Sequence, residues 1–144
     1  LVAVLASAPS AHAQVTWQIG AINDNWSVDD NWDTFAVPFA SFDSEAIIGA
    51  PQFVGGNPSG WNPNANVRAI GAVTNAPTVR IANGSETTGV LTIEAGNSLD
   101  VVATQTGSGI IISSGDVLVG QDGGTGTLDV AGTLSIASSL QAPT

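Results

Sequence analysis

The chemically capable side chains are densest between residues 23 and 33, where carboxylates and carboxamides follow one another closely. Hard oxygen ligands of this kind suit calcium. The candidate ligands are Asp24, Asp29, Asp30 and Asp33. Their spacing lacks the glycine and the distal glutamate of an EF-hand loop, and Asp and Asn also favour solvated turns. Calcium is therefore the one cofactor that the sequence suggests, and a solvated turn is the alternative that it favours.

Other carboxylates raise the question of glycoside hydrolysis, which needs two carboxyl groups that flank the bond to be broken. Asp100, Asp116 and Asp129 lie in or beside predicted strands and are the candidates that would reach outward. They would serve such a reaction only if they converged on one face of the fold. The sequence carries no recognisable acid–base motif, so we assign no catalytic residue.

The residue types that are missing exclude most other catalysts. The chain has no Cys or Tyr, its one His is His12, and its two cationic side chains are Arg68 and Arg80. Beyond residue 12 this excludes Ser-His triads, thiol nucleophiles, Schiff-base lysines and metals held by His or Cys. We therefore expect a protein that is not an enzyme.

Charge limits the class of partner. Twelve acidic residues against two basic ones give a formal net charge of −10. Nucleic acid and anionic membranes repel such a surface, so we do not expect either as a partner. A hydrophobic content of 43% with 10% charged residues indicates a folded chain rather than a disordered one.

The first thirteen residues have the pattern of a targeting segment. An apolar run, LVAVLASA, is followed by Ala11-His12-Ala13, which matches the A-x-A pattern before a signal-peptide cleavage site. We expect residues 1–13 to be the remnant of a signal peptide, with cleavage between Ala13 and Gln14. The mature protein would then lie on the outer membrane surface or outside the cell.

From residue 79 onward, pairs of branched apolar residues recur with one residue between the two members. The pairs are Val79/Ile81, Leu91/Ile93, Leu99/Val101, Ile110/Ile112, Val117/Val119, Leu128/Val130 and Leu134/Ile136. Each pair predicts a short strand with both side chains on one face. Long and short steps between pairs alternate, which indicates a repeat of about 18 residues with two strands in each unit and favours a parallel β-solenoid. An antiparallel sandwich or meander is the alternative, and a third strand in the long step stays open.

All eight aromatic residues lie between Trp17 and Trp61. We expect the aromatic-rich region to cap the first coil, because an open solenoid end exposes unpaired strand edges and apolar core. Residues 51–66 are rich in Pro, Gly and Asn and predict a long loop. Trp61 in this loop is the candidate contact for a carbohydrate, whereas the other tryptophans are expected in the core of the cap.

The N-terminal residues also carry a resemblance. Trp17, Trp26-Ser27, Asn31-Trp32, Pro38 and Ala46-Ile47-Ile48 form the pattern W…WS…NW…P…AII, which glycine-punctuated strand repeats follow. Over most of residues 15–136 the chain resembles the start of large exported bacterial proteins, the autotransporter-passenger-like and sorting-signal-bearing surface proteins with β-strand repeats. The resemblance implies a right-handed β-helix and a surface or secreted location, but says little about activity.

These observations combine into one hypothesis. The fold is expected to be all-β, a single-stranded parallel β-helix with an aromatic-rich N-terminal cap. Residues 1–13 are the signal remnant, residues 14–61 the cap with its long loop, and residues 62–144 the coils of a longer chain. We expect a non-enzymatic structural or adhesive segment whose partners are a carbohydrate or a cell surface and the rest of its own chain. The alternative is a β-helix that binds or degrades a polysaccharide.

Overall fold

The computed structural model describes residues 13–18, 21, 23–51, 61–105 and 111–137. Apart from the short 3-10 helix η1 (Asp29–Asn31), the regular structure of these residues is all strand, which confirms the predicted all-β class. The strands are β1 (Ala13–Thr16), β2 (Asp43–Ile48), β3 (Asn64–Ala69), β4 (Ala72–Ala76), β5 (Thr78–Asn83), β6 (Thr88–Ile93), β7 (Ser98–Val102), β8 (Thr104–Gln105), β9 (Ile111–Ser113), β10 (Val117–Gln121), β11 (Thr125–Val130) and β12 (Thr133–Ala137). The predicted signal remnant lies outside the described residues except for Ala13.

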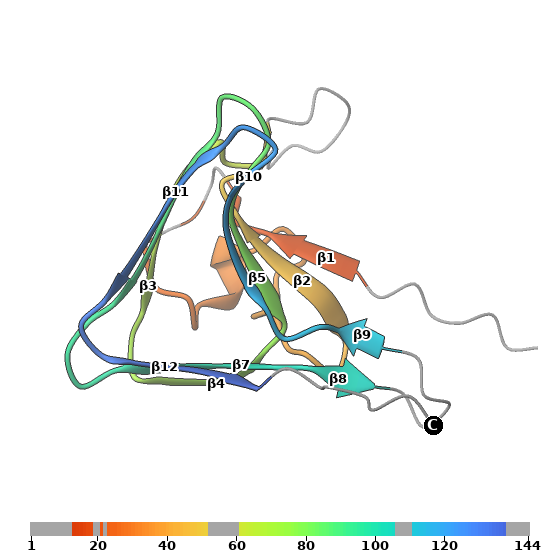
Figure 1. Cartoon of the computed structure of the whole chain (residues 1–144), viewed down its shortest axis with the longest axis vertical. Coiled ribbons are helices and arrows are strands. Elements are labelled where there is room, and N and C mark those ends of the chain that lie inside the picture. Colours follow the sequence, from red (N-terminus) through yellow and green to blue (C-terminus); the bar gives the residue numbers. More distant parts are fainter. Residues whose placement is uncertain (1–12, 19–20, 22, 52–60, 106–110, 138–144) are drawn as a thin grey trace, which may run out of the picture.

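Ten of these strands form three sheets, with strand orders β1-β2-β5-β10, β3-β6-β11 and β4-β7-β12. Every pair of neighbours in the three sheets is parallel. Figure 1 shows the sheets as the three sides of a triangle, around which the chain passes repeatedly. We call β2, β3 and β4 the first layer, β5, β6 and β7 the second layer, and β10, β11 and β12 the third layer. Antiparallel pairing between named strands is confined, among the described residues, to β8 and β9, so the sandwich or meander alternative is wrong.

The register between layers corrects the predicted repeat. Val79 pairs with Val117, and Leu91 pairs with Leu128. A residue and its partner in the next layer are therefore separated by one circuit of three strands, and the predicted two-strand unit of about 18 residues is wrong. The pair Ile110/Ile112 led to the wrong repeat length. Ile110 lies outside the described residues, and Ile112 belongs to β9, which pairs with β8. In the sequence, both of these strands lie between the second and the third layer.

The branched pairs of the second layer line the core, as the alternation of side chains along a strand predicts. Their relative exposure is 0%, because a layer covers them on each side; they are Val79, Ile81, Leu91, Ile93, Leu99 and Val101. Burying an aliphatic side chain of this size contributes about 1.5–3 kcal/mol relative to leaving it exposed. The first layer adds smaller residues to the same core, such as Ala46, Ala65 and Val67.

Glycine permits the close approach of strands at one corner of the triangle. Gly89 of β6 and Gly126 of β11 occupy equivalent positions in the register. A Cβ atom on Gly89 would lie 2.6 Å from the carbonyl oxygen of Ile48, and one on Gly126 would lie 2.6 Å from that of Ile81. Both contacts are with backbone, which cannot move aside as a flexible side chain can. A side chain at either position would therefore push the sheets apart.

Residues 13–42, which we call the N-terminal segment, meet the outer edges of the first layer. β1 pairs with β2, and Asn25 forms a parallel bridge with Arg68 of β3. The backbone N–H of Ala40 donates to the carbonyl oxygen of Asn75 in β4 at 2.8 Å. Each strand of the first layer thus has a backbone partner in this segment, which satisfies groups that an open end would leave unpaired.

Three tryptophans form the apolar centre of the N-terminal segment. Trp17, Trp26 and Trp32 are 2%, 0% and 0% exposed. The ring of Trp32 meets Trp17 and Trp26 edge to face, at centroid distances of 5.0 and 4.9 Å, an arrangement that aromatic quadrupoles favour. These bulky rings join the same apolar cluster as the first layer.

Candidate functional site

The aspartates proposed as calcium ligands mostly bind groups of the protein itself. Asp29 accepts a hydrogen bond from the backbone N–H of Val37 at 2.9 Å. Asp33 accepts one from the backbone N–H of Thr16 at 2.9 Å through Oδ1, and its Oδ2 accepts one from the ring N–H of Trp61 at 3.0 Å. Asp24 lies 3.5 Å from the guanidinium of Arg68.

Asp30, the fourth candidate, is exposed in η1, and its backbone carbonyl accepts a hydrogen bond from the side chain of Gln18. Within the described ranges, no three side chains among His, Cys, Asp and Glu are grouped as metal ligands would be. Three of the four carboxylates are therefore engaged within the fold: Asp29 and Asp33 by hydrogen bonds and Asp24 by its ion pair with Arg68.

Asparagines shape the turn between Asn23 and Asn31. The side-chain oxygens of Asn23 and Asn25 accept hydrogen bonds from the backbone two residues ahead, at 2.9 and 3.0 Å. Such Asx turns are a common use of Asn in tight backbone. Asn31 is buried and donates to the side-chain oxygen of Asn23 at 3.0 Å and to the carbonyl oxygen of Asn25 at 2.9 Å. The polar cluster thus positions the tryptophans beside it.

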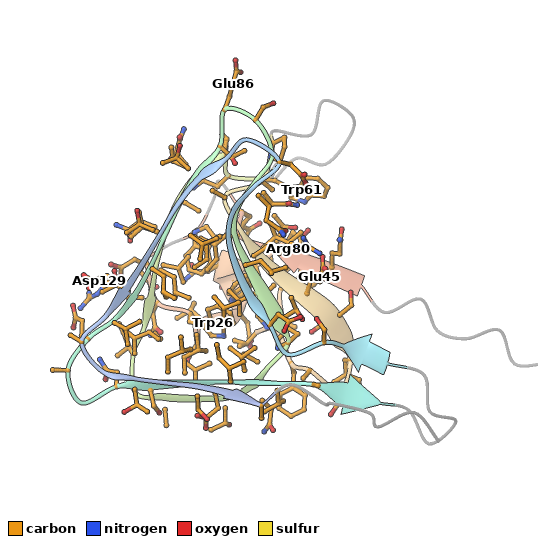
Figure 2. All side chains as sticks on the ribbon, viewed as in Figure 1. Trp26, Glu45, Trp61, Arg80, Glu86 and Asp129 are labelled. Atoms are coloured by element: carbon orange, nitrogen blue, oxygen red, sulfur yellow. The ribbon has the colours of Figure 1, made fainter. Side chains whose placement is uncertain are left out.

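Trp61, the proposed carbohydrate contact, is half-buried. It forms an antiparallel bridge with Gln18 in addition to its hydrogen bond to Asp33. Figure 2 shows it outside the triangle, on the same side of the molecule as Glu45 and Arg80, whereas Trp26 lies inside. Trp61 therefore contacts the N-terminal segment through Gln18 and Asp33, and the residue remains partly accessible.

Sequence reasoning missed the exposed aromatic residues that the structure describes. Phe35, Phe39 and Phe42 are 61%, 37% and 73% exposed. The rings of Phe39 and Phe42 lie 6.0 Å apart, and Phe35 has a positive φ of 54°, which is unusual for a bulky residue. No signal in the sequence separates these phenylalanines from the buried tryptophans, because both types share one stretch of the chain.

The two arginines connect successive layers. Arg80 of the second layer contacts Glu45 of the first at 2.5 Å and also donates to Gln121 of the third. Arg68 of the first layer lies 2.6 Å from Glu94, which follows β6, and 3.5 Å from Asp24. Hydrogen bonds to Glu45 and to Glu94 raise the pKa of Arg80 and of Arg68, respectively, so both guanidinium groups stay charged. With both of these cations paired, neither offers an open site for an anionic ligand.

Two of the three outward-reaching aspartates belong to different sheets. Asp100 on β7 is in register with Ser135, and Asp129 on β11 is in register with Thr92. Asp116 precedes β10, where its carbonyl oxygen accepts a hydrogen bond from the backbone N–H of Val79. Asp100 and Asp129 therefore lie on different sheets and do not form the pair that a two-carboxylate reaction would require.

A hollow of about 400 Å³ lies at the corner where β5 turns into β6. It is lined by Pro51, Pro63, Ser85, Glu86 and Thr87. Figure 2 shows Glu86 at this corner, directed away from the core. Glu86 is the one carboxylate among the described residues that line the hollow, and it has no partner there for acid–base catalysis.

The only helix within the described ranges is η1, and none there is long and apolar enough to cross a membrane. Comparisons of the chain with protein-family models, with curated proteins and with solved structures found no match.

Proposed function

We propose that this chain is a non-enzymatic structural or adhesive segment of a bacterial surface or secreted protein, built as a right-handed β-solenoid. The observation that carries the proposal is the parallel, in-register stacking of three layers around one apolar core. In such a stack each layer rests on its neighbours, so length can be added without changing the cross-section. The segment would act as a rigid spacer that resists proteases and holds a contact surface away from the cell.

The right-handed form is supported by a general rule. A strand that crosses over to a parallel neighbour in the same sheet does so with a right-handed connection in about 98% of known cases. Each passage from β2 to β5, or from β3 to β6, is a crossover of this kind. We extend the rule to every circuit of the stack.

The N-terminal segment has the properties of a cap. Its backbone contacts all three strands of the first layer, and its tryptophans continue the apolar core. Covering an end in this way prevents strand edges from pairing with other chains. Its polar residues hold backbone and aromatic rings in place, which is support for a structural role.

The register of β1 is consistent with export. The pairing of β1 with β2 is irregular between Ala13 and Gln14, and it becomes regular from Gln14 onward. Removal of residues 1–13 would therefore leave the regular part of the pairing intact. Mass spectrometry of the protein recovered from culture medium should find Gln14 as the first residue.

For the polysaccharide-degrading alternative we find no supporting geometry, because Asp100 and Asp129 lie on different sheets and Asp116 lies outside the strands. Binding without hydrolysis is more compatible with the accessible part of Trp61. Loss of binding to glycans in a Trp61→Ala variant, with binding retained in a Trp61→Phe variant that keeps an aromatic ring but lacks the hydrogen bond to Asp33, would identify that residue as the contact.

Limited proteolysis tests the structural role. The chain and a Leu91→Asp variant, in which a charge replaces a fully buried residue, should be treated with a non-specific protease. We expect a resistant core that spans β5 to β7 in the unmodified chain and rapid cleavage in the variant. Equal rates of cleavage would contradict the proposal, as would the release of reducing sugar ends when the chain is incubated with polysaccharides.

A further inference from the structure

Three Asn-x-Ser motifs occur in the chain, at Asn25, Asn57 and Asn83. In exported proteins this is the pattern at which sugars are attached to asparagine, provided that the middle residue is not proline. The middle residue of the motif at Asn57 is Pro58, which excludes that motif. The two other motifs lie among the described residues, and their surroundings distinguish them.

The motif at Asn25 is built into the N-terminal segment. Its middle residue, Trp26, is 0% exposed and packs against Trp32. The side-chain oxygen of Asn25 accepts a hydrogen bond from the backbone N–H of Ser27, and its backbone forms the bridge to Arg68 of β3. Attachment of a sugar at this asparagine would require the buried part of the segment to open.

The motif at Asn83 lies in the turn that leads from β5 to β6. Ser85 and Glu86 are exposed, and Figure 2 shows the side chain of Glu86 directed outward from this corner. Asn83 is half-buried, and its backbone N–H donates to the carbonyl oxygen of Gly49 at 2.8 Å. Its side-chain amide has no hydrogen-bond partner among the residues that the structure describes. This corner therefore presents the motif at the surface with the amide nitrogen unengaged.

The same turn borders the hollow at the corner between β5 and β6. Gly84 packs against Pro51, because a Cβ atom on this glycine would lie 2.5 Å from Cγ of the proline ring. Pro51 and Ser85 line the hollow of about 400 Å³ together with Pro63. The two proline rings offer apolar surface to the C–H face of a sugar. A sugar joined to Asn83 would thus have space and an apolar contact beside its point of attachment.

We propose that Asn83 carries an N-linked glycan, an inference that rests on the proposed export of the chain. In the transfer, the amide nitrogen of Asn83 forms a bond to the anomeric carbon of a sugar. The donor is an activated sugar, an ester of a nucleotide phosphate or a lipid phosphate. The bond between its anomeric carbon and the phosphate oxygen breaks, the phosphate leaves with the electron pair, and the amide proton passes to a base of the transferase. The glycan then shields the exposed turn, since such turns are preferred sites of proteolysis.

Mass spectrometry of the chain recovered from the culture medium of its natural producer tests the proposal. We expect the peptide that contains Asn83 to carry the mass of at least one sugar, and the peptide that contains Asn25 to carry none. Ser85→Ala should abolish the addition, whereas Ser85→Thr should retain it, because either hydroxyl residue completes the motif. The matched control is Asn66→Gln, which replaces an exposed asparagine outside these motifs and should leave the addition intact.

A glutamate-specific protease gives a second measurement, because Glu86 is exposed directly after the motif. Cleavage after Glu86 should be slower in the unmodified sequence than in an Asn83→Gln variant, and equal rates would contradict the shielding. An Asn83 without sugar, a mass gain that matches deamidation alone, or an addition that survives in Ser85→Ala would each overturn the proposal. A chain that is exported and resists proteases without any sugar would refute the glycan and leave the proposed structural role intact.

Discussion

Identical leucine substitutions in different layers can test how the core is built. Leu91 of the second layer pairs with Leu128 of the third, and Leu99 pairs with Leu134 in the same way. Leu91 and Leu99 are fully buried, whereas Leu128 and Leu134 are half-buried. Residue type and direction are the same within each pair, so the two members differ in the layer that they occupy.

The expected cost of replacement by alanine follows from this difference. Removing three carbon groups from Leu91 loses about 0.8 kcal/mol for each, and the neighbouring layers leave a closed cavity that adds to the loss. We expect Leu91→Ala and Leu99→Ala to lower the free energy of unfolding by about 3–5 kcal/mol each. Leu128→Ala and Leu134→Ala leave a space that opens to water, so we expect about 1–2 kcal/mol each.

Urea unfolding followed by tryptophan fluorescence measures these losses, because Trp17, Trp26 and Trp32 are buried in the folded chain. Midpoints can be compared directly if the slope of the transition is unchanged. Equal losses at Leu91 and Leu128 would refute the layered core, since the two positions would then have equivalent surroundings.

Three further predictions concern the corner, the ion pairs and pH. Gly89→Ala should destabilise the chain by about 1–3 kcal/mol in urea unfolding, because the added Cβ clashes with backbone. The control, Gly96→Asn, should have little effect, because a Cβ at Gly96 meets no atom within 4 Å and Asn tolerates the positive φ of 84°. Arg80→Met should lower the free energy of unfolding by about 1–3 kcal/mol, because it leaves Glu45, whose side chain is 17% exposed, without its cation. A Glu45→Gln change in the same background should restore part of this loss. The raised pKa of both arginines means that their ion pairs persist until the pH exceeds the ordinary range of arginine. Since the chain has no Lys, Tyr or Cys, its thermal unfolding midpoint should not change between about pH 8.5 and pH 10. A step in the midpoint within that interval would contradict this reasoning.

The sequence predicted the strands of the second and third layers well because their interior residues are large and branched. Val79/Ile81 and Leu91/Ile93 stand out from the Ser, Thr and Gly around them, and both pairs are buried as predicted. The first layer was harder to predict, since small residues such as Ala65 and Ala76 fill its part of the core. Because alanine is also common elsewhere in the chain, its spacing does not reveal a repeat.

The length of the circuit could not be predicted for a related reason. Ile110 and Ile112 are spaced like the pairs of the layered strands, although Ile112 lies in β9, which pairs with β8 and not with a strand of the three sheets. When the repeat length is estimated from the spacing of apolar residues, such a strand is counted as one of the repeating strands. The strand pairing that shows the true repeat joins residues more than 30 positions apart, such as Val79 of the second layer and Val117 of the third.

Residue type alone did not predict which groups the candidate site residues contact. Asp29 and Asp33 are suitable calcium ligands by chemistry, yet their oxygens accept hydrogen bonds from backbone and from Trp61. Whether a carboxylate meets an ion or a backbone N–H depends on the path of the turn, which the sequence does not reveal. The same holds for aromatic residues: Trp26 is buried, and Phe42, sixteen positions later, is 73% exposed.

The pairing of successive layers can be measured directly, because the chain has no cysteine and two introduced thiols would form a unique disulfide. Val90 and Thr127 are partners in register on the outer face of β6 and β11, and Thr125 is displaced by two residues along β11. In-register neighbours lie about 4.8 Å apart, within the range that a disulfide spans, and a displacement of two residues exceeds that range. The parallel stack predicts rapid oxidation of the Val90→Cys/Thr127→Cys variant and little in Val90→Cys/Thr125→Cys. Failure of the first variant to cross-link, or equal cross-linking of both, would contradict the stacked layers.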